Sequence, residues 1–429
     1  MKNYLLFSCA VVALVGSSGV AAADAPGKFD IKLGGDASFT GLYVHQTLDS
    51  NLSNVDFTNK LRLEITPTAK ADNGLEYGAA LRIRAWMGNG TIDADQAYIF
   101  ADGQFGRVEA GLATGASRYS VAAPSGFGTG GVFGDWADGP SPTPISNQHT
   151  YIAGTFGGEA VGVTSNAWGT KVVYITPRFF AQEAPNTGLL GGLSFTPQNM
   201  SVGTGVDRTK TITAAPGATP DSLCSESHQT NAATPIQGCK WRNMAEAVLR
   251  YDGTFKGISV SGSVGYEHGE VSAPAVTTNA SFNQLDVYQV GLQLGYAGFL
   301  IGGSYQDAGK SGYSKGTSVG SLNSVRNKTG QSSYTAGISY ETGPVVVGFN
   351  YAHGKDAGDF SLPGARTADM YAVGVTYTVA PGLTTSLEYM RSETHNQAGF
   401  GPTFDDYLGL TQAQSGNASL VMWKTAVTF

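Results

Sequence analysis

Apolar and polar residues alternate along most of this chain with a period of two, as they do in β-strands whose two faces meet different surroundings. Near the C-terminus, for example, Leu383, Leu387 and Tyr389 lie on one face and polar residues on the other. The pattern predicts an all-β chain. Sixteen windows of this kind lie between turn-forming residues, at 29–48, 55–70, 74–88, 92–102, 104–113, 170–178, 188–197, 242–252, 257–269, 284–297, 299–307, 331–342, 344–354, 366–379, 382–393 and 418–429.

The connections between these strands alternate between short and long in the second half of the chain. The short connections are 252–256, 297–298, 341–344 and 380–382. The long ones are 198–241, 270–283, 308–330, 355–365 and 394–417. Successive connections of antiparallel strands fall on opposite sides of the sheet, so one side carries the tight turns and the other the long loops. This is the layout of an antiparallel transmembrane β-barrel, and an even strand count puts both chain ends on the short-turn side.

The last segment, 417–429, fits a strand that faces lipid. One face is mostly apolar and carries Val421, Trp423, Thr425, Val427 and Phe429, and the other carries Met422, Lys424, Ala426 and Thr428. In hydrocarbon every backbone N–H and C=O must be paired within the protein, so the sheet has to close on itself. A barrel of sixteen strands leaves room for water inside, so its inward polar residues need not be buried.

The N-terminus has the layout of an export signal. Lys2 precedes an apolar run at 4–15, and three alanines ending at Ala23 follow. This order predicts a secretory signal peptide cleaved after Ala23. The alternative, a membrane anchor, is disfavoured because a spanning helix needs about 20 apolar residues. We therefore expect a signal peptide at 1–23 and an exported barrel at 24–429.

Composition and charge narrow the range of partners. The chain holds 59 glycines, 20 tyrosines and 20 phenylalanines, and only 14% of its residues are charged. Removing Lys2 from the 26 basic residues leaves 25 against 33 acidic ones, a net charge of −8. This balance disfavours nucleic acid as a partner. Cys224 and Cys239 lie in one long loop, where an oxidising compartment favours a disulfide. Two thiols without a histidine pattern do not suit a metal site.

Charged residues concentrate on the polar faces of the second, third and fifth predicted strands. Arg or Lys on a lipid-facing position near the membrane midplane costs about 2–4 kcal/mol, so we expect these side chains to point into the lumen. The cations are Lys60, Arg62, Arg82, Arg84 and Arg107. Together they predict a basic wall on one side of the barrel interior.

The connection after the fifth strand, 114–169, is the longest of the first half and is rich in glycine. Connections of this length in compact proteins are usually functional. We expect it to fold into the lumen and narrow it, with Asp135 and Asp138 facing the basic wall. Such a constriction selects solutes by size and charge. The alternative is an external loop whose acidic residues are solvated.

Several segments resemble the Gram-negative general porins, in particular those of alphaproteobacteria. The segment QAYIFADGQFGRVEAGLATGA (96–116) leads into the long loop, VYITPR (173–178) follows it, and the final strand ends on Phe429. The resemblance implies an outer-membrane barrel of sixteen strands, usually a homotrimer, with an inward-folded third loop. It also implies passive diffusion of small hydrophilic solutes and ions.

The resemblance further assigns Asp135 and Asp138 to the constriction loop, opposite the basic wall. The loop also holds Arg118, which joins the basic residues of the constriction, and its acids are few, so charge selectivity does not follow from the resemblance. The terminal strand is implied to be the assembly signal, read by the barrel-assembly machinery, through residues Trp423, Val427 and Phe429. Contacts with lipid and lipopolysaccharide are expected. No cofactor is expected, and calcium on the outer loops stays open.

Two other functions stay open from the sequence: an outer-membrane barrel enzyme of the lipase or protease type, and a secreted β-rich adhesin. A barrel enzyme needs a nucleophile or an acid beside a positioned histidine. His268, His353 and His395 lie near strand ends on the long-loop side. Because nothing marks a nucleophile beside them, we expect a protein without enzymatic activity.

Overall fold

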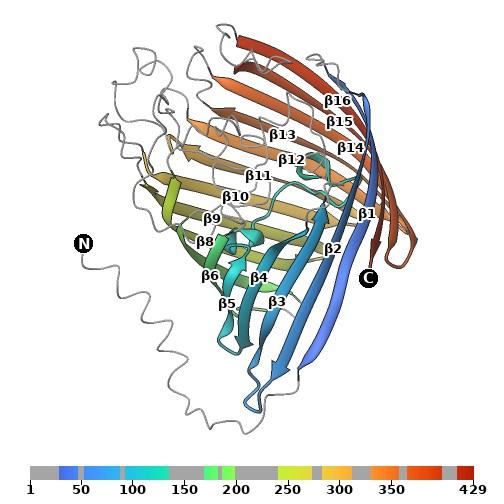
Figure 1. Cartoon of the computed structure of the whole chain (residues 1–429). Coiled ribbons are helices and arrows are strands. Elements are labelled where there is room, and N and C mark those ends of the chain that lie inside the picture. The colour runs from blue at the N-terminus through green and yellow to red at the C-terminus, as the bar shows by residue number, and fades with distance from the viewer. Residues whose placement is uncertain are drawn as a thin grey trace.

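Sixteen antiparallel strands close into a barrel in which each strand pairs with its neighbours in sequence and β1 pairs with β16 (Figure 1). The computed structural model describes residues 29–46, 53–86, 92–134, 169–181, 186–198, 240–272, 283–311, 330–356, 365–398 and 413–429. The predicted signal peptide lies outside these ranges. None of the helices found within them is long and apolar enough to cross a membrane.

The strands are β1 (Asp30–Gln46), β2 (Val55–Lys70), β3 (Glu76–Trp86), β4 (Ile92–Gly103), β5 (Gly106–Ala113), β6 (Gly169–Ile175), β7 (Gly188–Gln198), β8 (Lys240–Phe255), β9 (Ile258–Ser272), β10 (Leu285–Tyr296), β11 (Phe299–Gly309), β12 (Gln331–Thr342), β13 (Val345–Asp356), β14 (Arg366–Ala380), β15 (Leu383–Ala398) and β16 (Ala413–Thr428). Two short 3₁₀ turns, η1 (Ala116–Tyr119) and η2 (Gly131–Phe133), lie between β5 and β6. The predicted all-β barrel of sixteen antiparallel strands is confirmed.

Strand boundaries differ most from the sequence prediction on the long-loop side, where β15 ends at Ala398 and β16 begins at Ala413, each five residues beyond its predicted limit. A smaller difference lies beside one tight turn. β8 runs on to Phe255, three residues beyond its predicted end, and β9 begins at Ile258. Lys256 and Gly257 form the two-residue link, with φ of 49° and 83°. Two residues with left-handed φ give this turn the twist that matches antiparallel strands. The link therefore needs only two residues, fewer than the sequence predicted.

The two faces of the sheet have opposite chemistry. Leu61 and Val421 are exposed on the outside, whereas Met390 and Met422 are almost fully buried on the inside. Aromatic side chains gather on the outer face near the strand ends, as with Phe299 and Tyr340, whose rings are 4.4 Å apart. An apolar outer band with aromatic rings near its edges is typical of a barrel that spans a membrane.

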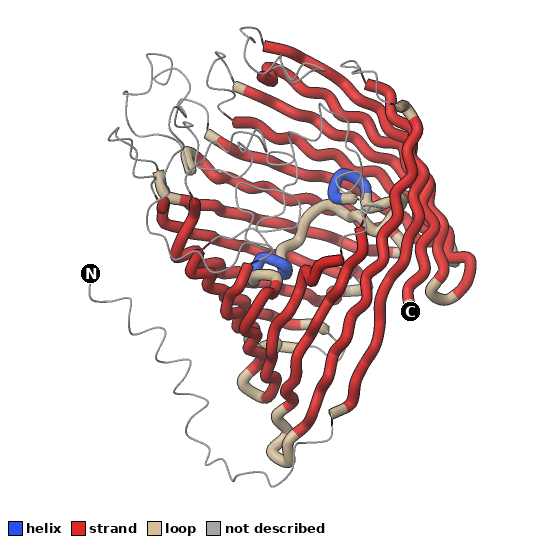
Figure 2. Tube along the Cα trace, in the orientation of Figure 1, coloured by secondary structure: helices blue, strands red, loops and turns tan. Residues whose placement is uncertain are grey.

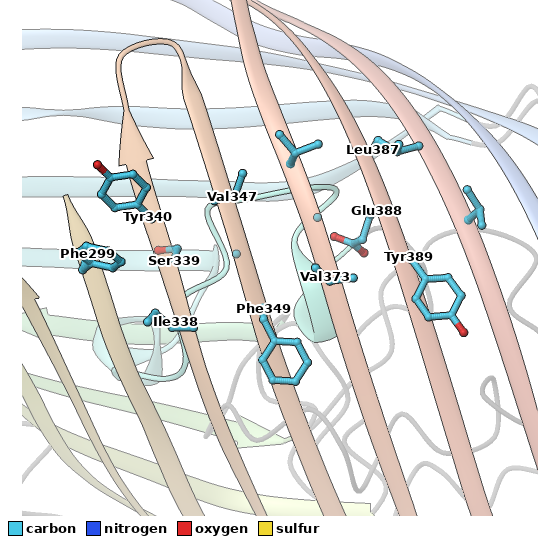
Figure 3. A pocket seen from close by; sticks show the side chains of 14 residues that line it. Phe299, Ile338, Ser339, Tyr340, Val347, Phe349, Val373, Leu387, Glu388 and Tyr389 are labelled. Carbon is cyan, nitrogen blue, oxygen red and sulfur yellow. The ribbon is translucent and has the colours of Figure 1, made fainter.

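Neighbouring residues of one strand face the lipid and the lumen in turn. A shallow apolar hollow of about 630 Å³ lies on the outer face of β11–β16, where Phe349, Val373 and Tyr389 contribute to its lining (Figure 3). Glu388 precedes Tyr389 on β15 and points toward the lumen instead. The strand therefore places a ring against the membrane and a carboxylate inside the barrel within two positions.

The C-terminus closes the barrel on the short-turn side, as the sequence predicted. The backbone N–H of Phe429 donates to the carbonyl of Gly35 (3.0 Å), and the N–H of Gly35 donates back (2.9 Å). Thr428 N–H donates to the carbonyl of Gly382, which lies in the tight turn between β14 and β15. The ring of Phe429 covers Gly35, where a side chain would collide with the backbone of Arg62.

Candidate functional site: a loop folded into the barrel lumen

The connection after β5 enters the barrel and follows its inner wall. Figure 2 shows η1 and η2 inside the ring of strands, joined by an extended segment. We call residues 114–134 the lumen loop. Beyond contacts with its own stem on β4 and β5, its backbone and side chains bond to inward-facing side chains from β7 to β16, at 78 to 293 residues away in sequence. The predicted inward fold of this loop is therefore confirmed for its described part.

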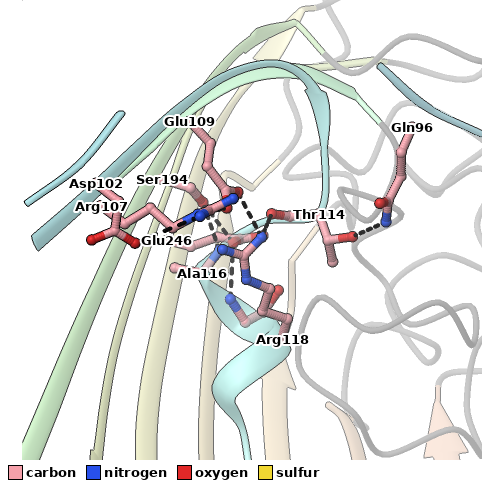
Figure 4. A network of polar contacts seen from close by, with 10 residues as sticks. Gln96, Asp102, Arg107, Glu109, Thr114, Ala116, Arg118, Ser194 and Glu246 are labelled. Atoms are coloured by element: carbon pink, nitrogen blue, oxygen red, sulfur yellow. Dashed lines mark hydrogen bonds and ion pairs between the residues drawn. The ribbon is translucent and has the colours of Figure 1, made fainter. Parts of the chain in front are cut away.

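The start of the lumen loop is held by a buried carboxylate on β8. Glu246 accepts hydrogen bonds from the Ser194 hydroxyl (2.6 Å) and from the backbone N–H of Ser117 (3.2 Å). The Ser194 hydroxyl in turn accepts from Ala116 N–H (3.2 Å; Figure 4). A Cβ on Gly115 would overlap the Glu246 carboxylate, so glycine here lets the turn approach this anchor without displacing it. The first 3₁₀ turn is thus fixed to two neighbouring strands.

The middle of the lumen loop is held through its backbone. Hydroxyl groups of the wall accept from loop N–H groups, and wall amides donate to loop carbonyls. The bonds run from Val121 N to Ser263 Oγ (2.8 Å), from Ala123 N to Thr335 Oγ1 (3.3 Å), from Gln289 Nε2 to Val121 O (2.9 Å), from Gln293 Nε2 to Ala122 O (2.8 Å) and from Asn350 Nδ2 to Pro124 O (3.0 Å). Because these contacts use the backbone, the wall fixes the path of the loop.

The far end of the lumen loop is held by a second buried carboxylate, Glu388, which is 1% exposed. It accepts from the N–H (2.8 Å) and the hydroxyl (2.9 Å) of Thr129, and from the N–H of Gly131 (2.9 Å). The Asn350 amide oxygen accepts from Val132 N–H at 3.1 Å. Hydrogen bonds to a charged acceptor contribute about 1.5–3 kcal/mol each, so Glu388 is the strongest single anchor of this end.

Glycines let the lumen loop approach these anchors. Gly128 and Gly131 have φ of 58° and 62°, in the left-handed region that favours glycine. A Cβ on Gly128 would collide with the Glu388 carboxylate, and one on Gly131 with the Asn350 amide. The glycine-rich stretch seen in the sequence is thus required by close contact with the wall.

Apolar contacts complete the docking. Phe127 is almost fully buried, and its ring lies over Gly348 of β13, where a side chain would overlap it. Val132 belongs to a buried cluster with Met390 and Leu42 at the β14–β16 and β1 side of the barrel, and Phe133 packs against that cluster. The loop end therefore reaches the strand next to β2.

The predicted basic wall lies on β2 and β3. Arg62 and Arg84 are directly opposite each other in the strand register, and Glu64 is opposite Arg82. These positions alternate with the outward-facing Leu61, so their side chains face the lumen, and Lys60 shares their face. Because the middle of the loop bonds to β9–β13, the basic wall lies across the lumen from that part of the loop.

The other two predicted cations form a separate cluster at the loop stem. Glu109 lies between Arg107 Nε and Arg118 Nη1, each 2.7 Å from a carboxylate oxygen (Figure 4). Arg107 also stacks over the Phe100 ring at 4.1 Å and is 3.6 Å from Asp102. Burial lowers the pKa of Arg118, but its bond to Glu109 outweighs this and holds that pKa above its usual value. Arg118 therefore stays charged.

Sequence reasoning missed a second cluster of this kind. Asp252 on β8 accepts from Arg250 Nε (2.8 Å) and Nη2 (2.9 Å), from Arg178 Nη1 (2.9 Å) and from the Ser261 hydroxyl (2.7 Å). Arg250 and Asp252 are two positions apart and share the polar face of their strand. The basic wall was predicted from the same pattern. Arg178 closes the predicted window 170–178, but it lies beyond the end of β6 at Ile175.

The predicted acids Asp135 and Asp138, and the cysteines Cys224 and Cys239, lie outside the described residues. Between 114 and 134 the loop sequence has no acidic residue and one basic residue, Arg118. Over the described ranges, no group of three or more histidine, cysteine, aspartate or glutamate side chains is arranged to hold a metal ion.

A closed antiparallel barrel, apolar outside and narrowed inside by a loop fixed to its wall, defines a transmembrane channel. The chain matches the Gram-negative porin family over residues 10–397 and belongs to that family. It is an outer-membrane porin.

Solved structures share its fold. The anion-selective porin from Comamonas acidovorans aligns with a TM-score of 0.56 at 14% identity, over 94% of this chain and 100% of that one. OmpT, an outer membrane protein of Vibrio cholerae described in a trimer form, aligns with a TM-score of 0.53 at 11% identity, over 94% and 99%. At these identities the likeness concerns the fold alone. No curated protein matches the chain.

Proposed function

We propose that this porin passes small hydrophilic solutes and ions across the outer membrane by passive diffusion. The observation that carries the proposal is the lumen loop, which is fixed at both ends and along its middle to the inner wall. A fixed constriction sorts solutes by size and charge without binding them tightly, which rapid passage requires.

We also propose that Asp135 and Asp138 face the basic wall and form the charged part of the constriction with Arg62, Arg82 and Arg84. Support comes from the end of the described loop, where residues 132–133 pack in a cluster that includes inward residues of β1. β1 pairs with β2, which carries part of the basic wall.

Reversal potentials in a KCl gradient across a planar bilayer test this arrangement. Asp135→Asn should shift the preference toward anions and Arg82→Gln toward cations. Arg391→Gln is the matched control, because Arg391 pairs with Glu393 (2.7 Å) on the outer face. If neither lumen variant moves the potential, the assignment of the constriction is wrong. A wild-type protein that gives no stepwise conductance would refute the channel function itself.

We further propose a homotrimer that associates through the β3–β5 sector. Small residues face outward there and alternate with aliphatic ones, whereas the outer face of β9–β16 is rich in aromatic rings. A flat sector suits contact with another barrel. The outward-facing alanines are Ala79, Ala97, Ala101 and Ala110. Ala101→Trp should lower the trimer fraction in detergent, measured by light scattering, whereas Val373→Trp on the far side should not. A trimer fraction equal in both variants would contradict this sector.

The alternative of a barrel enzyme depends on the rim histidines. Two of them lie on the outer face. Each histidine ring is within hydrogen-bond distance of an aspartate, and a tyrosine hydroxyl donates to the same carboxylate oxygen of that aspartate. The groups are His268 with Asp286 (2.9 Å) and Tyr266, and His353 with Asp369 (2.8 Å) and Tyr351. Aromatic and polar groups at strand ends suit the membrane–water interface, which supports contact with lipid head groups more than nucleophile activation.

Two proposals from the sequence extend this function beyond the described residues. We propose that the signal peptide is removed after Ala23 and that Cys224 and Cys239 form a disulfide. Intact-mass analysis of protein from outer membranes tests both. The mature mass should begin at Asp24, and alkylation should add two groups only after reduction. Labelling of both thiols without a reductant would refute the disulfide.

A further inference from the structure

We propose that four arginines around the stem of the lumen loop form a weak binding site for small oxyanions, namely phosphate and carboxylate groups. The residues are Arg107, Arg118, Arg178 and Arg250, which we call the arginine patch. The proposal rests on the channel function above and extends it by naming a class of permeant that the lumen recognises.

Each arginine of the patch is braced by a carboxylate. Glu109 holds Arg107 and Arg118, and Asp252 holds Arg178 and Arg250. Stacking on Phe100 further fixes Arg107. A guanidinium whose position is already fixed loses little freedom when it binds an anion, so bracing favours recognition.

The stem of the lumen loop joins the two halves of the patch. Arg118 lies within η1, and Arg250 Nη1 is 3.4 Å from the carbonyl of Tyr119 in the same turn. Arg107 follows the tight turn between β4 and β5, and Asp252 precedes the one between β8 and β9. The patch therefore lies on the short-turn side of the loop stem, at the wall of the lumen.

Donor groups of the patch stay available. The four side chains are 23–28% exposed. The bonds to Glu109 and Asp252 use only some of the five N–H donors of each guanidinium, and Arg107 and Arg118 also interact with Tyr98 and Tyr119. Among the described residues, no nitrogen of the four arginines is buried without a partner, so donors that the protein does not use meet the water of the lumen. A guanidinium edge of this kind matches the geometry of phosphate and carboxylate.

Neighbouring charges limit the affinity. Asp102 is 3.6 Å from Arg107 and 45% exposed, so four cations stand against three carboxylates at the patch. Behind η1, Glu246, Glu267 and Lys171 are almost completely buried. Recognition therefore depends on oriented donors more than on net charge. Weak binding of this kind suits a channel, because a permeant must also leave.

Single-channel recording of the full-length mature protein tests the proposal. In KCl, added potassium phosphate should reduce the conductance in a saturable way, and acetate should act similarly at higher concentration. The variant R118K/R178K keeps both charges but removes two guanidinium edges, so the half-blocking phosphate concentration should rise about tenfold. Asp102→Asn removes a competing carboxylate and should lower the half-blocking phosphate concentration.

Arg391→Gln on the outer face is the control and should block like wild type. Variants are compared only when their KCl conductance and heat-modifiable migration match wild type; one that fails is replaced by R178K alone, which leaves the loop stem intact. Absence of saturable block in conducting wild-type channels, or an unchanged half-blocking concentration in the lysine variant, overturns the patch. Absence of any KCl conductance instead refutes the channel function.

Discussion

The substitution Gly128→Ala should release the far end of the lumen loop from the barrel wall. Gly128 has φ of 58°, and a Cβ there would occupy the position of the Glu388 carboxylate. That carboxylate accepts the N–H groups of Thr129 and Gly131 and the hydroxyl of Thr129. The methyl group cannot be placed unless the carboxylate or the loop moves.

The size of the effect follows from these contacts. A left-handed conformation costs a residue with a side chain about 1–2 kcal/mol. Each hydrogen bond to a charged acceptor contributes about 1.5–3 kcal/mol, so losing two of the three at Glu388 costs about 3–6 kcal/mol. The sum is about 4–8 kcal/mol against docking of this end, whereas a neutral anchor such as the Ser263 contact contributes about 0.5–1.5 kcal/mol. The start of the loop keeps its bond to Glu246.

Single-channel current in a planar bilayer is the assay. We expect Gly128→Ala to increase the mean conductance and the open-channel noise, since the loop end no longer holds one position. Gly126→Ala is the control, because a Cβ there meets nothing within 4 Å. Heat stability of the barrel should be similar in both, since no strand ladder changes. Traces of Gly128→Ala that match those of Gly126→Ala would refute the reasoning.

Two further changes test other parts of the structure. Phe429→Ala should lower the amount of folded protein in the outer membrane, measured as the heat-modifiable band, because the terminal ring covers Gly35 beside the β1–β16 seam; equal amounts would contradict this role. Lys171→Met should lower the free energy of unfolding by about 3–5 kcal/mol in a urea titration, because it removes the cation that interacts with the buried Glu246 and Glu267. Adding Glu267→Gln should restore part of that loss, and a double variant no more stable than Lys171→Met would argue against the charge explanation.

Most of the barrel could be predicted because each strand position faces one of two environments, the lipid or the lumen. Leu61 meets lipid and Arg62 meets the lumen, and this choice is visible in a local window without knowledge of the partner strand. The same rule placed Val421 outside and Met422 inside. Period-two alternation carries this information wherever a sheet separates water from hydrocarbon.

The anchors of the lumen loop could not be predicted in the same way. Glu246 and Glu388 are inward polar positions like many others in the sequence. What distinguishes them is the loop backbone that they bind, which lies 129 and 259 residues away. The bond between Arg178 and Asp252 likewise spans 74 residues. Such contacts depend on where the loop crosses each strand, which no local pattern encodes.

The glycines of loop and wall belong to one interface. Gly291, Gly348 and Gly374 are inward strand positions where a Cβ would overlap Val121, Phe127 and Gly128 of the loop, respectively. The backbone of the loop and the Phe127 ring thus lie directly on the backbone of the wall strands. The barrel therefore sets the position of the loop, rather than side-chain conformations. Charged side chains of the wall that do not bond to the loop can then change without moving it. Selectivity and pore geometry are in this way carried by different residues.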